Sequence, residues 1–174
     1  LDQLYRALAE DNTSAAEAAL KHREVVAQIN SGPSAEGKPL LLDARSAEMV
    51  EVLIRAGASI EPVSEYWAPG FGLDHIPRSV SEALLESGAA ATIHAAAALG
   101  LAPLVGELLD EAPELLDAPG GDGGTPLHFA RTIEVAEILV NRGAKPDARD
   151  QDHRSTPAQW HVSSAPEIAR YLLN

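Results

Sequence analysis

The sequence predicts an all-α protein, a solenoid of about six helix–turn–helix repeats in which the third repeat is irregular. Three observations predict this fold. An apolar triplet at positions i, i+3 and i+4, which marks one face of a helix, recurs six times. A Gly-Ala pair follows the last leucine of the triplet at the same offset in three copies. Equivalent markers are spaced like tandem helical repeats, with 31 positions from Gly57 to Gly88 and 33 from Thr92 to Thr125. The triplets are Ala16, Ala19, Leu20; Met49, Val52, Leu53; Val80, Ala83, Leu84; Val105, Leu108, Leu109; Val135, Ile138, Leu139; and Ile168, Tyr171, Leu172.

The clearest repeat starts with the segment Gly-Gly-Thr-Pro-Leu-His-Phe-Ala at 123–130. Thr125 is a natural N-cap, because its side-chain oxygen can accept a backbone N–H of the first helical turn. Pro126 suits the first helical position, where its missing N–H would have no helical partner in any case. Gly143 stands where a helix ends in a left-handed residue. This stretch is therefore predicted to hold two short helices, the second of which carries Val135, Ile138 and Leu139.

Together these features resemble the signature of the ankyrin repeat, Gly-x-Thr-Pro-Leu-His-x-Ala followed by Leu-x-x-x-Gly-Ala. The resemblance covers nearly the whole chain. It implies a scaffold for protein–protein interaction that binds a partner through its finger loops and the concave face of its first helices. It also implies a structural role for His128, whose ring bonds neighbouring backbone and Thr groups, and we extend that role to His94 by register. The segments at 65–72, 123–130 and 152–160 are together similar to a group of bacterial ankyrin-repeat proteins.

We expect a single domain over 1–174, with helices of roughly 6–10 residues and almost no strand. One leucine of each triplet should be among the most buried residues, because it occupies the same position between successive layers. These leucines are Leu53, Leu84, Leu109, Leu139 and Leu172. The repeats are expected at about 1–30, 37–61, 62–91, 92–122, 123–153 and 154–174.

The first three repeats depart from the motif. Repeat one lacks it, as terminal capping repeats often do, and Thr13 or Ser14 is expected to cap its second helix. In repeat two Leu41 stands in place of the histidine, and the first helix is predicted to be short. Repeat three also lacks the motif, and Ser79 or Ser81 is expected to start its second helix.

Composition limits the functional classes. Hydrophobic residues make up 45% of the chain but aromatic ones only 4%, so Ala and Leu must build the core. A net charge of −13 argues against nucleic acid and anionic membrane as partners, and no apolar run reaches the ~18 residues of a membrane span. The absence of cysteine fits a reducing cytoplasm, and no signal peptide opens the sequence. We expect a cytoplasmic monomer that binds another protein; the chain begins at Leu1 rather than Met, so we expect it to be trimmed upstream.

Catalytic and metal-binding patterns are missing from the sequence. It has no Gly-x-Ser-x-Gly, no cysteine and no His-Glu-x-x-His. The glycine-rich segment 120–124 lacks the Gly-Lys-Ser/Thr ending of a phosphate loop and is expected to be a finger turn with positive φ. Asp150, Asp152 and His153 crowd one loop, for which a charged finger tip is favoured over a weak metal site. We therefore expect no enzyme activity, no cofactor and no metal.

The candidate partner-binding residues form three groups. Tyr66, Trp67 and Phe71 either fill the gap left by the missing first helix of repeat three or form an aromatic hot spot. No Lys or Arg occurs between Arg78 and Arg131, so the acidic residues there form either a solvated flank, which we favour, or a site for a basic partner. Asp117 and Asp122 are the candidates of this acidic group, and the third group is a finger, 149–154, whose charges alternate in sign, with Asp150, Asp152 and Arg154 as candidates.

Two other functions remain open at this stage. One is a ligand-binding or hydrolytic protein with a pocket at the irregular third repeat. The other is the recognition domain of a longer multidomain protein, because fold alone does not fix function. Trp160, which replaces a small residue in the first helix of repeat six, is expected to cover the exposed end of the stack or to pack on whatever follows.

Overall fold

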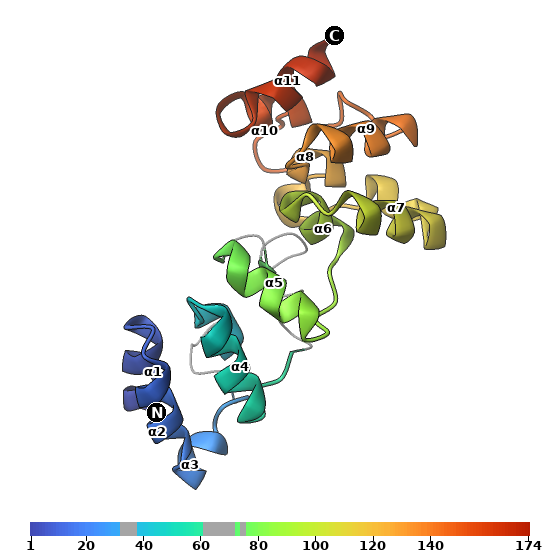
Figure 1. Ribbon diagram of the computed structural model, residues 1–174. Coiled ribbons are helices and arrows are strands. Elements are labelled where there is room, and N and C mark those ends of the chain that lie inside the picture. Colours follow the sequence, from blue (N-terminus) through green and yellow to red (C-terminus); the bar gives the residue numbers. More distant parts are fainter. Residues whose placement is uncertain (32–37, 61–71, 74–75) are drawn as a thin grey trace. The chain divides into compact units, whose positions relative to one another are not determined.

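The computed structural model describes residues 1–31, 38–60, 72–73 and 76–174. The described residues fold entirely into helices, turns and loops without a strand, as predicted (Figure 1). They divide into two compact units, one ending at Ala90 and the other beginning at Ala91. Each unit is a separate stack of helices and is described by itself.

The N-terminal unit stacks its helices in chain order. Contacts join α1 to α2, α2 to α4, and α4 to α5. Its core is made of fully buried aliphatic side chains, among them Leu4, Met49, Leu53 and Leu84. The elements are α1 (Asp2–Ala9), α2 (Thr13–Leu20), α3 (Arg23–Val26), the 3₁₀ helix η1 (Leu40–Asp43), α4 (Ala47–Arg55) and α5 (Arg78–Glu86).

Two helix starts in this unit differ from the prediction. The side chain of Asn12, rather than that of Thr13 or Ser14, caps α2 by accepting the N–H of Ala15 at 2.9 Å. Asn is as good an N-cap as Ser and lies where the backbone is still extended.

Helix α5 begins at Arg78, after Pro77, so neither Ser79 nor Ser81 starts it. Ser81 is buried inside the helix, and its hydroxyl donates to the carbonyl of Leu73 at 2.5 Å. This serine therefore ties α5 to the segment before it.

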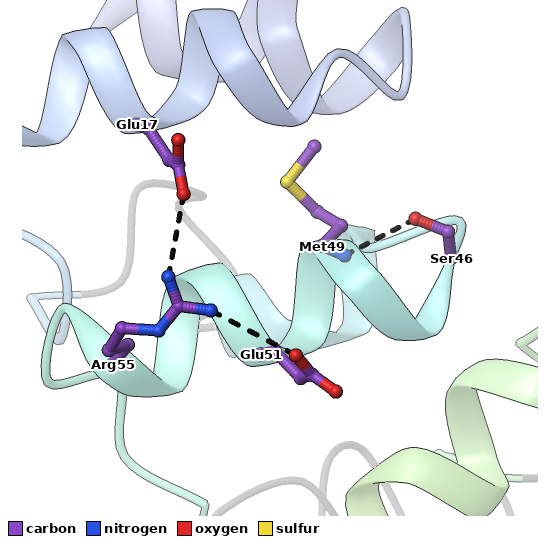
Figure 2. A network of polar contacts seen from close by, with 5 residues as sticks. All are labelled: Glu17, Ser46, Met49, Glu51 and Arg55. Carbon is purple, nitrogen blue, oxygen red and sulfur yellow. Dashed lines mark hydrogen bonds and ion pairs between the residues drawn. The ribbon is translucent and has the colours of Figure 1, made fainter.

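Polar contacts connect successive repeats of the N-terminal unit. Arg55 of α4 reaches Glu17 of α2 at 3.4 Å and Glu51 of its own helix at 3.9 Å, while Ser46 caps α4 by accepting the N–H of Met49 (Figure 2). A second link starts from Asn30.

The amide of Asn30 bonds to both sides of the turn that ends repeat two. Its nitrogen donates to the carbonyl of Gly57 at 2.8 Å, and its oxygen accepts the N–H of Ser59 at 2.7 Å. One side chain thus satisfies two backbone groups of the following repeat.

The C-terminal unit is built in two layers around one apolar cluster. The first helices α6, α8 and α10 pack on one another, and the second helices α7, α9 and α11 form the other layer (Figure 1). The elements are α6 (Ile93–Leu99), α7 (Ala102–Glu111), η4 (Pro113–Asp117), η5 (Gly121–Gly123), α8 (Pro126–Phe129), α9 (Ile133–Asn141), α10 (Pro157–Ser164) and α11 (Pro166–Leu173).

Four of the five predicted layer leucines are among the most buried residues: Leu53, Leu84, Leu109 and Leu139 are at most 2% exposed. The prediction for Leu172 is wrong, because this side chain is only half-buried. Within the described residues the main contacts of α11 are with α10 and α9. Five of the described elements are shorter than the expected 6–10 residues: α3, η1 and α8 have four residues each, η4 has five and η5 three.

Candidate functional site

Two loops of the C-terminal unit lie against each other and form what we call the finger pair, residues 117–124 and 145–155. A backbone hydrogen bond joins them, from the N–H of Gln151 to the carbonyl of Asp122 at 2.8 Å. Gly123 makes this approach possible, because a Cβ at this position would lie 2.4 Å from Cγ of Gln151. The two loops therefore form one surface.

The first finger is a tight turn closed by its own backbone. The N–H of Gly120 donates to the carbonyl of Gly124 at 2.8 Å, and the N–H of Gly123 to that of Gly120 at 3.1 Å. Asp122 and Gly123 have φ of +54° and +70°. The predicted positive-φ turn is thus present, and aspartate is one of the few side chains that adopts this conformation readily.

The second finger is organised around the Asp150 carboxylate. This group accepts hydrogen bonds from the N–H of His153 at 2.6 Å, the N–H of Ser155 at 3.0 Å and the indole N–H of Trp160 at 2.8 Å. Burial tends to raise the pKa of the Asp150 carboxyl, but these three donors and nearby His128 lower it below its usual value. The carboxylate therefore stays charged at neutral pH and holds the loop in one shape.

Asp150 consequently differs from the exposed finger-tip charge that the sequence suggested. Its side chain is only 2% exposed, and its acceptor positions face groups of its own loop and of α10. It supports the surface rather than forming part of it, so we leave it out of the partner-binding set proposed below.

His128 links α8 to the second finger. Its Nδ1 accepts the N–H of Thr125 at 2.9 Å, which places the ring proton on Nε2, and Nε2 donates to the carbonyl of Ser155 at 3.2 Å. Burial lowers the pKa of His128, and Ser155, Asp150 and Thr125 only partly offset this effect. The structural role expected for His128 is therefore supported by its geometry: the neutral imidazole closes the capping box of α8.

His94 shares only half of this arrangement. Its Nε2 donates to the carbonyl of Ala118 at 2.8 Å, but among the described residues its buried Nδ1 has no hydrogen-bond partner. The reason is the offset from the cap: α6 begins after Thr92, whose hydroxyl accepts the N–H of Ala95, so His94 lies two residues beyond the cap instead of three.

A third buried histidine, His161 of α10, was not identified from the sequence. Its Nε2 donates to the carbonyl of Leu127 at 3.1 Å and so links repeat six to repeat five. Burial lowers the pKa of this imidazole too. No motif marks His161, because in repeat six Gln159 takes the capping position that His128 has in repeat five.

Trp160 packs backward onto repeat five. Its ring lies edge-on to those of His128 and Phe129, with centroids 5.1 and 5.3 Å away. The expectation that Trp160 covers the end of the stack is therefore wrong, since the hydrogen bond to Asp150 orients the indole toward the second finger.

The remaining predicted site residues of this unit lie at its surface. Asp117, Asp152 and Arg154 are exposed, and Asp122 is half-buried. Asp117 lies 4.0 Å from the ammonium of Lys145, and so pairs with the second finger. The finger pair thus brings together the acidic and the mixed-charge segments singled out in the sequence.

The three aromatic candidates, Tyr66, Trp67 and Phe71, lie outside the described residues, and so does the irregular loop of repeat three. Their role stays a prediction. Across the described part of the chain, no three His, Asp or Glu side chains gather as metal ligands would. Nor does any helix there have the length and apolar character needed to cross a membrane.

Paired helices in two layers, loops that project between repeats and the Thr-His capping box define a helical-repeat protein of the ankyrin type. Residues 122–151 match the family model of the ankyrin repeat. Residues 122–151 are thus an ankyrin repeat, the chain has the fold of an ankyrin-repeat solenoid, and ankyrin repeats in general mediate protein–protein interaction.

Two known proteins illustrate the likeness. Over 82 residues the chain is 35% identical to ankyrin repeat and SAM domain-containing protein 6 of Mus musculus, a match that covers 44% of this chain and 9% of that protein's length. The crystal structure of the human ASB11 ankyrin repeat domain superposes with a TM-score of 0.56 at 22% identity, covering 98% of this chain and 80% of that one. At this identity the second likeness shows the fold alone.

Proposed function

We propose that the protein binds another protein through the finger pair, with Asp117, Asp152 and Arg154 as its exposed contact residues. The observation that carries this proposal is the way the loops are held. The Asp150 carboxylate and the bond from Gln151 to Asp122 order both fingers before any partner arrives. Binding to a preordered surface avoids most of the entropy loss that ordering a free loop would require.

The charges on this surface suggest the partner's chemistry. Asp117 and Asp152 favour a Lys or Arg of the partner, and Arg154 favours a carboxylate. The guanidinium of Arg149 donates to the carbonyl of Arg154 at 2.6 Å and braces this end of the finger. We therefore infer a partner segment that carries both signs of charge, in an order complementary to the finger pair.

The test begins with capture of a partner from the source organism and its identification by mass spectrometry. Its affinity is then measured for the unchanged protein and for the double variant Asp152→Asn, Arg154→Gln. We expect at least a tenfold loss, about 1.4 kcal/mol, chiefly through slower association at low salt.

A matched control removes the same two charges elsewhere in the same unit. Glu137 on α9 and Arg170 on α11 are exposed and belong to the layer of second helices. The double variant Glu137→Gln, Arg170→Gln should bind as the unchanged protein does. If both double variants weaken binding equally, or neither does, the finger pair is not the binding surface.

Trp67 gives a second and separate prediction for the aromatic segment. As a hot-spot residue, it should cost about 2 kcal/mol or more of binding energy when changed to alanine. As a filler of repeat three, it should instead lower the stability of the fold and leave affinity unchanged. Measuring the affinity and the unfolding curve of Trp67→Ala side by side separates the two roles.

A further inference from the structure

A second surface feature of the C-terminal unit lies at α7 and η4, the elements that precede the first finger in the chain. A hollow of about 310 Å³ opens where α7, η4 and the end of α9 meet. Apolar side chains line it from α7 and η4, and the ion pair between Arg142 and Asp110, 2.6 Å apart, stands at its edge. The lining residues are Leu109, Asp110, Pro113, Leu116 and Arg142.

The size of this hollow restricts what it could hold. Small-molecule sites usually occupy about 300–1,000 Å³ and enclose most of the ligand. This hollow lies at the lower limit, and three of its five lining residues, Asp110, Pro113 and Arg142, are exposed. It therefore suits one apolar side chain of a bound peptide better than a cofactor.

Two carboxylates without counter-ions are sequence neighbours of residues that line the hollow. Glu111 follows Asp110 in the sequence, and Glu114 follows Pro113; both are exposed, and neither forms an ion pair with any described residue. Glu107, one turn earlier on α7, is exposed in the same way. The nearby Asp110, in contrast, is already paired with a cation of the next repeat.

We propose that this hollow, which we call the α7–η4 hollow, receives an apolar side chain of a basic peptide segment, whose neighbouring Lys or Arg residues pair with Glu111 and Glu114. Charge complementarity supports this choice of occupant, because the stretch from 79 to 130 holds no Lys or Arg, and Arg142, the cation that lines the hollow, is already paired with Asp110. The inference rests on the proposed function, since it assigns part of the partner protein a second contact on the same unit.

The experiment uses a synthetic probe, the N-acetylated and C-amidated peptide Lys-Lys-Leu-Lys-Lys, titrated into the ¹⁵N-labelled protein and followed by NMR. We expect saturable shifts at the amides of Leu109, Leu116 and Arg142. The matched peptide with Ser in place of Leu should bind at least fivefold more weakly, because it lacks the apolar anchor. Equal binding of the two peptides would show that no side chain enters the hollow and would overturn the proposal.

Charge variants complete the test. The double variant Glu111→Lys, Glu114→Lys should weaken the peptide at least tenfold. The control double variant, Glu10→Lys with Glu86→Lys, makes the same change of charge at two exposed positions of the N-terminal unit. Glu10, Glu86 and Glu111 all lie at the C-terminal end of a helix, where the helix dipole favours a cation, so the substitutions are comparable in their effect on the helix. An equal loss of peptide affinity in the control would show that the protein attracts the peptide only through its overall negative charge. Absence of chemical-shift changes at the hollow up to millimolar peptide would show that the hollow is not a binding site. Either result overturns the inference.

The finger-pair variant, Asp152→Asn with Arg154→Gln, is included in the same titration. It should bind the probe peptide as the unchanged protein does, because its substitutions lie outside the hollow. The two proposals can therefore fail independently. The finger pair is tested with the captured partner, and the hollow is tested with the peptide.

Discussion

Acid should destabilise the C-terminal unit well before its carboxylates titrate. Three imidazoles in this unit, those of His94, His128 and His161, are at most 5% exposed, and each donates from Nε2 to a backbone carbonyl. Burial lowers the pKa of all three below the ordinary value of 6.5. Protonation of His128 would in addition place an N–H on Nδ1. This N–H would point at the backbone N–H of Thr125, from which Nδ1 accepts a hydrogen bond in the neutral ring.

The direction of the pH effect follows from proton binding. Below about pH 6.5 the unfolded chain binds protons at these histidines that the folded chain does not, so the free energy of unfolding falls as the pH falls. The stabilisation is complete above pH 6.5 and decreases from there toward the lower pKa of the folded state. Asp150 raises the pKa of His128 and Glu167 that of His161, while Arg131 and His128 lower that of His161.

The magnitude can be bounded. Between pH 7.5 and 5.5, an imidazole that stays neutral in the folded state reduces the unfolding free energy by about 1.4 kcal/mol, so three reduce it by at most about 4 kcal/mol. That is a large share of the about 5–15 kcal/mol that stabilises a typical domain. Acid sensitivity should therefore be visible in a simple urea titration.

The assay follows urea unfolding at pH 7.5, 6.5 and 5.5 through the fluorescence of Trp160, in a background where Trp67, the other tryptophan of the chain, is changed to Phe. The variant His128→Gln is the matched control, because Gln159 shows that glutamine closes the same box: its Oε1 accepts the N–H of Thr156 at 2.8 Å. This variant should lose about a third of the pH dependence. A free energy that does not change between pH 7.5 and 5.5, or a full dependence in the variant, would refute the reasoning.

Three further tests of the contacts within the fold use five substitutions. Leu139→Ala should lower the free energy of unfolding by about 2–5 kcal/mol, whereas Leu172→Ala, at a half-buried position, should lower it by less than about 1 kcal/mol. Both values come from chemical denaturation, and equal losses would mean that the layers are misassigned. Gly123→Ala should cost about 2–5 kcal/mol, because the new Cβ clashes with Gln151 and the residue is also strained by its positive φ. Gly143→Ala should cost only that strain, about 1–2 kcal/mol, because no atom lies within 4 Å of its new Cβ. Similar melting temperatures of the two variants would contradict this. Asn30→Ala should cost about 1–3 kcal/mol by removing two exposed hydrogen bonds to the next turn, about 0.5–1.5 kcal/mol each, and faster hydrogen exchange at that turn would report the loss.

The helices and their buried faces could be predicted because their signals are local. Each second helix carries its own apolar triplet, and the Thr-Pro-Leu-His box contains both partners of its hydrogen bonds within four residues. Repetition then confirms the register. The failure at Leu172 has a different cause: the triplet predicts that this leucine packs on the core, which it does, but does not specify how much of the side chain its neighbours cover.

The candidate site was predicted less well, because contacts between repeats decide which way a finger residue points. Asp150 and Asp152 are the same residue type two positions apart, yet one is buried and the other exposed. One of the three donors to the buried Asp150 carboxylate is the indole N–H of Trp160, which lies ten positions later on helix α10. The ring of His94 shows the same limit: a shift of one residue in the helix start removes the partner of its Nδ1.

Three ion pairs between repeats, all among the described residues, share one orientation along the chain. Arg55 reaches back to Glu17, Arg142 to Asp110 and Lys145 to Asp117, so each time a cation of the later repeat meets a carboxylate of the earlier one. Exposed pairs of this kind contribute little to stability, at most about 1 kcal/mol each. These ion pairs nevertheless have a consequence for the evolution of the repeats by duplication. A copied or transposed repeat would place its cation beside a neighbour that lacks the matching carboxylate. Each junction therefore has its own identity, and the repeats, alike as they are in fold, are not interchangeable in order.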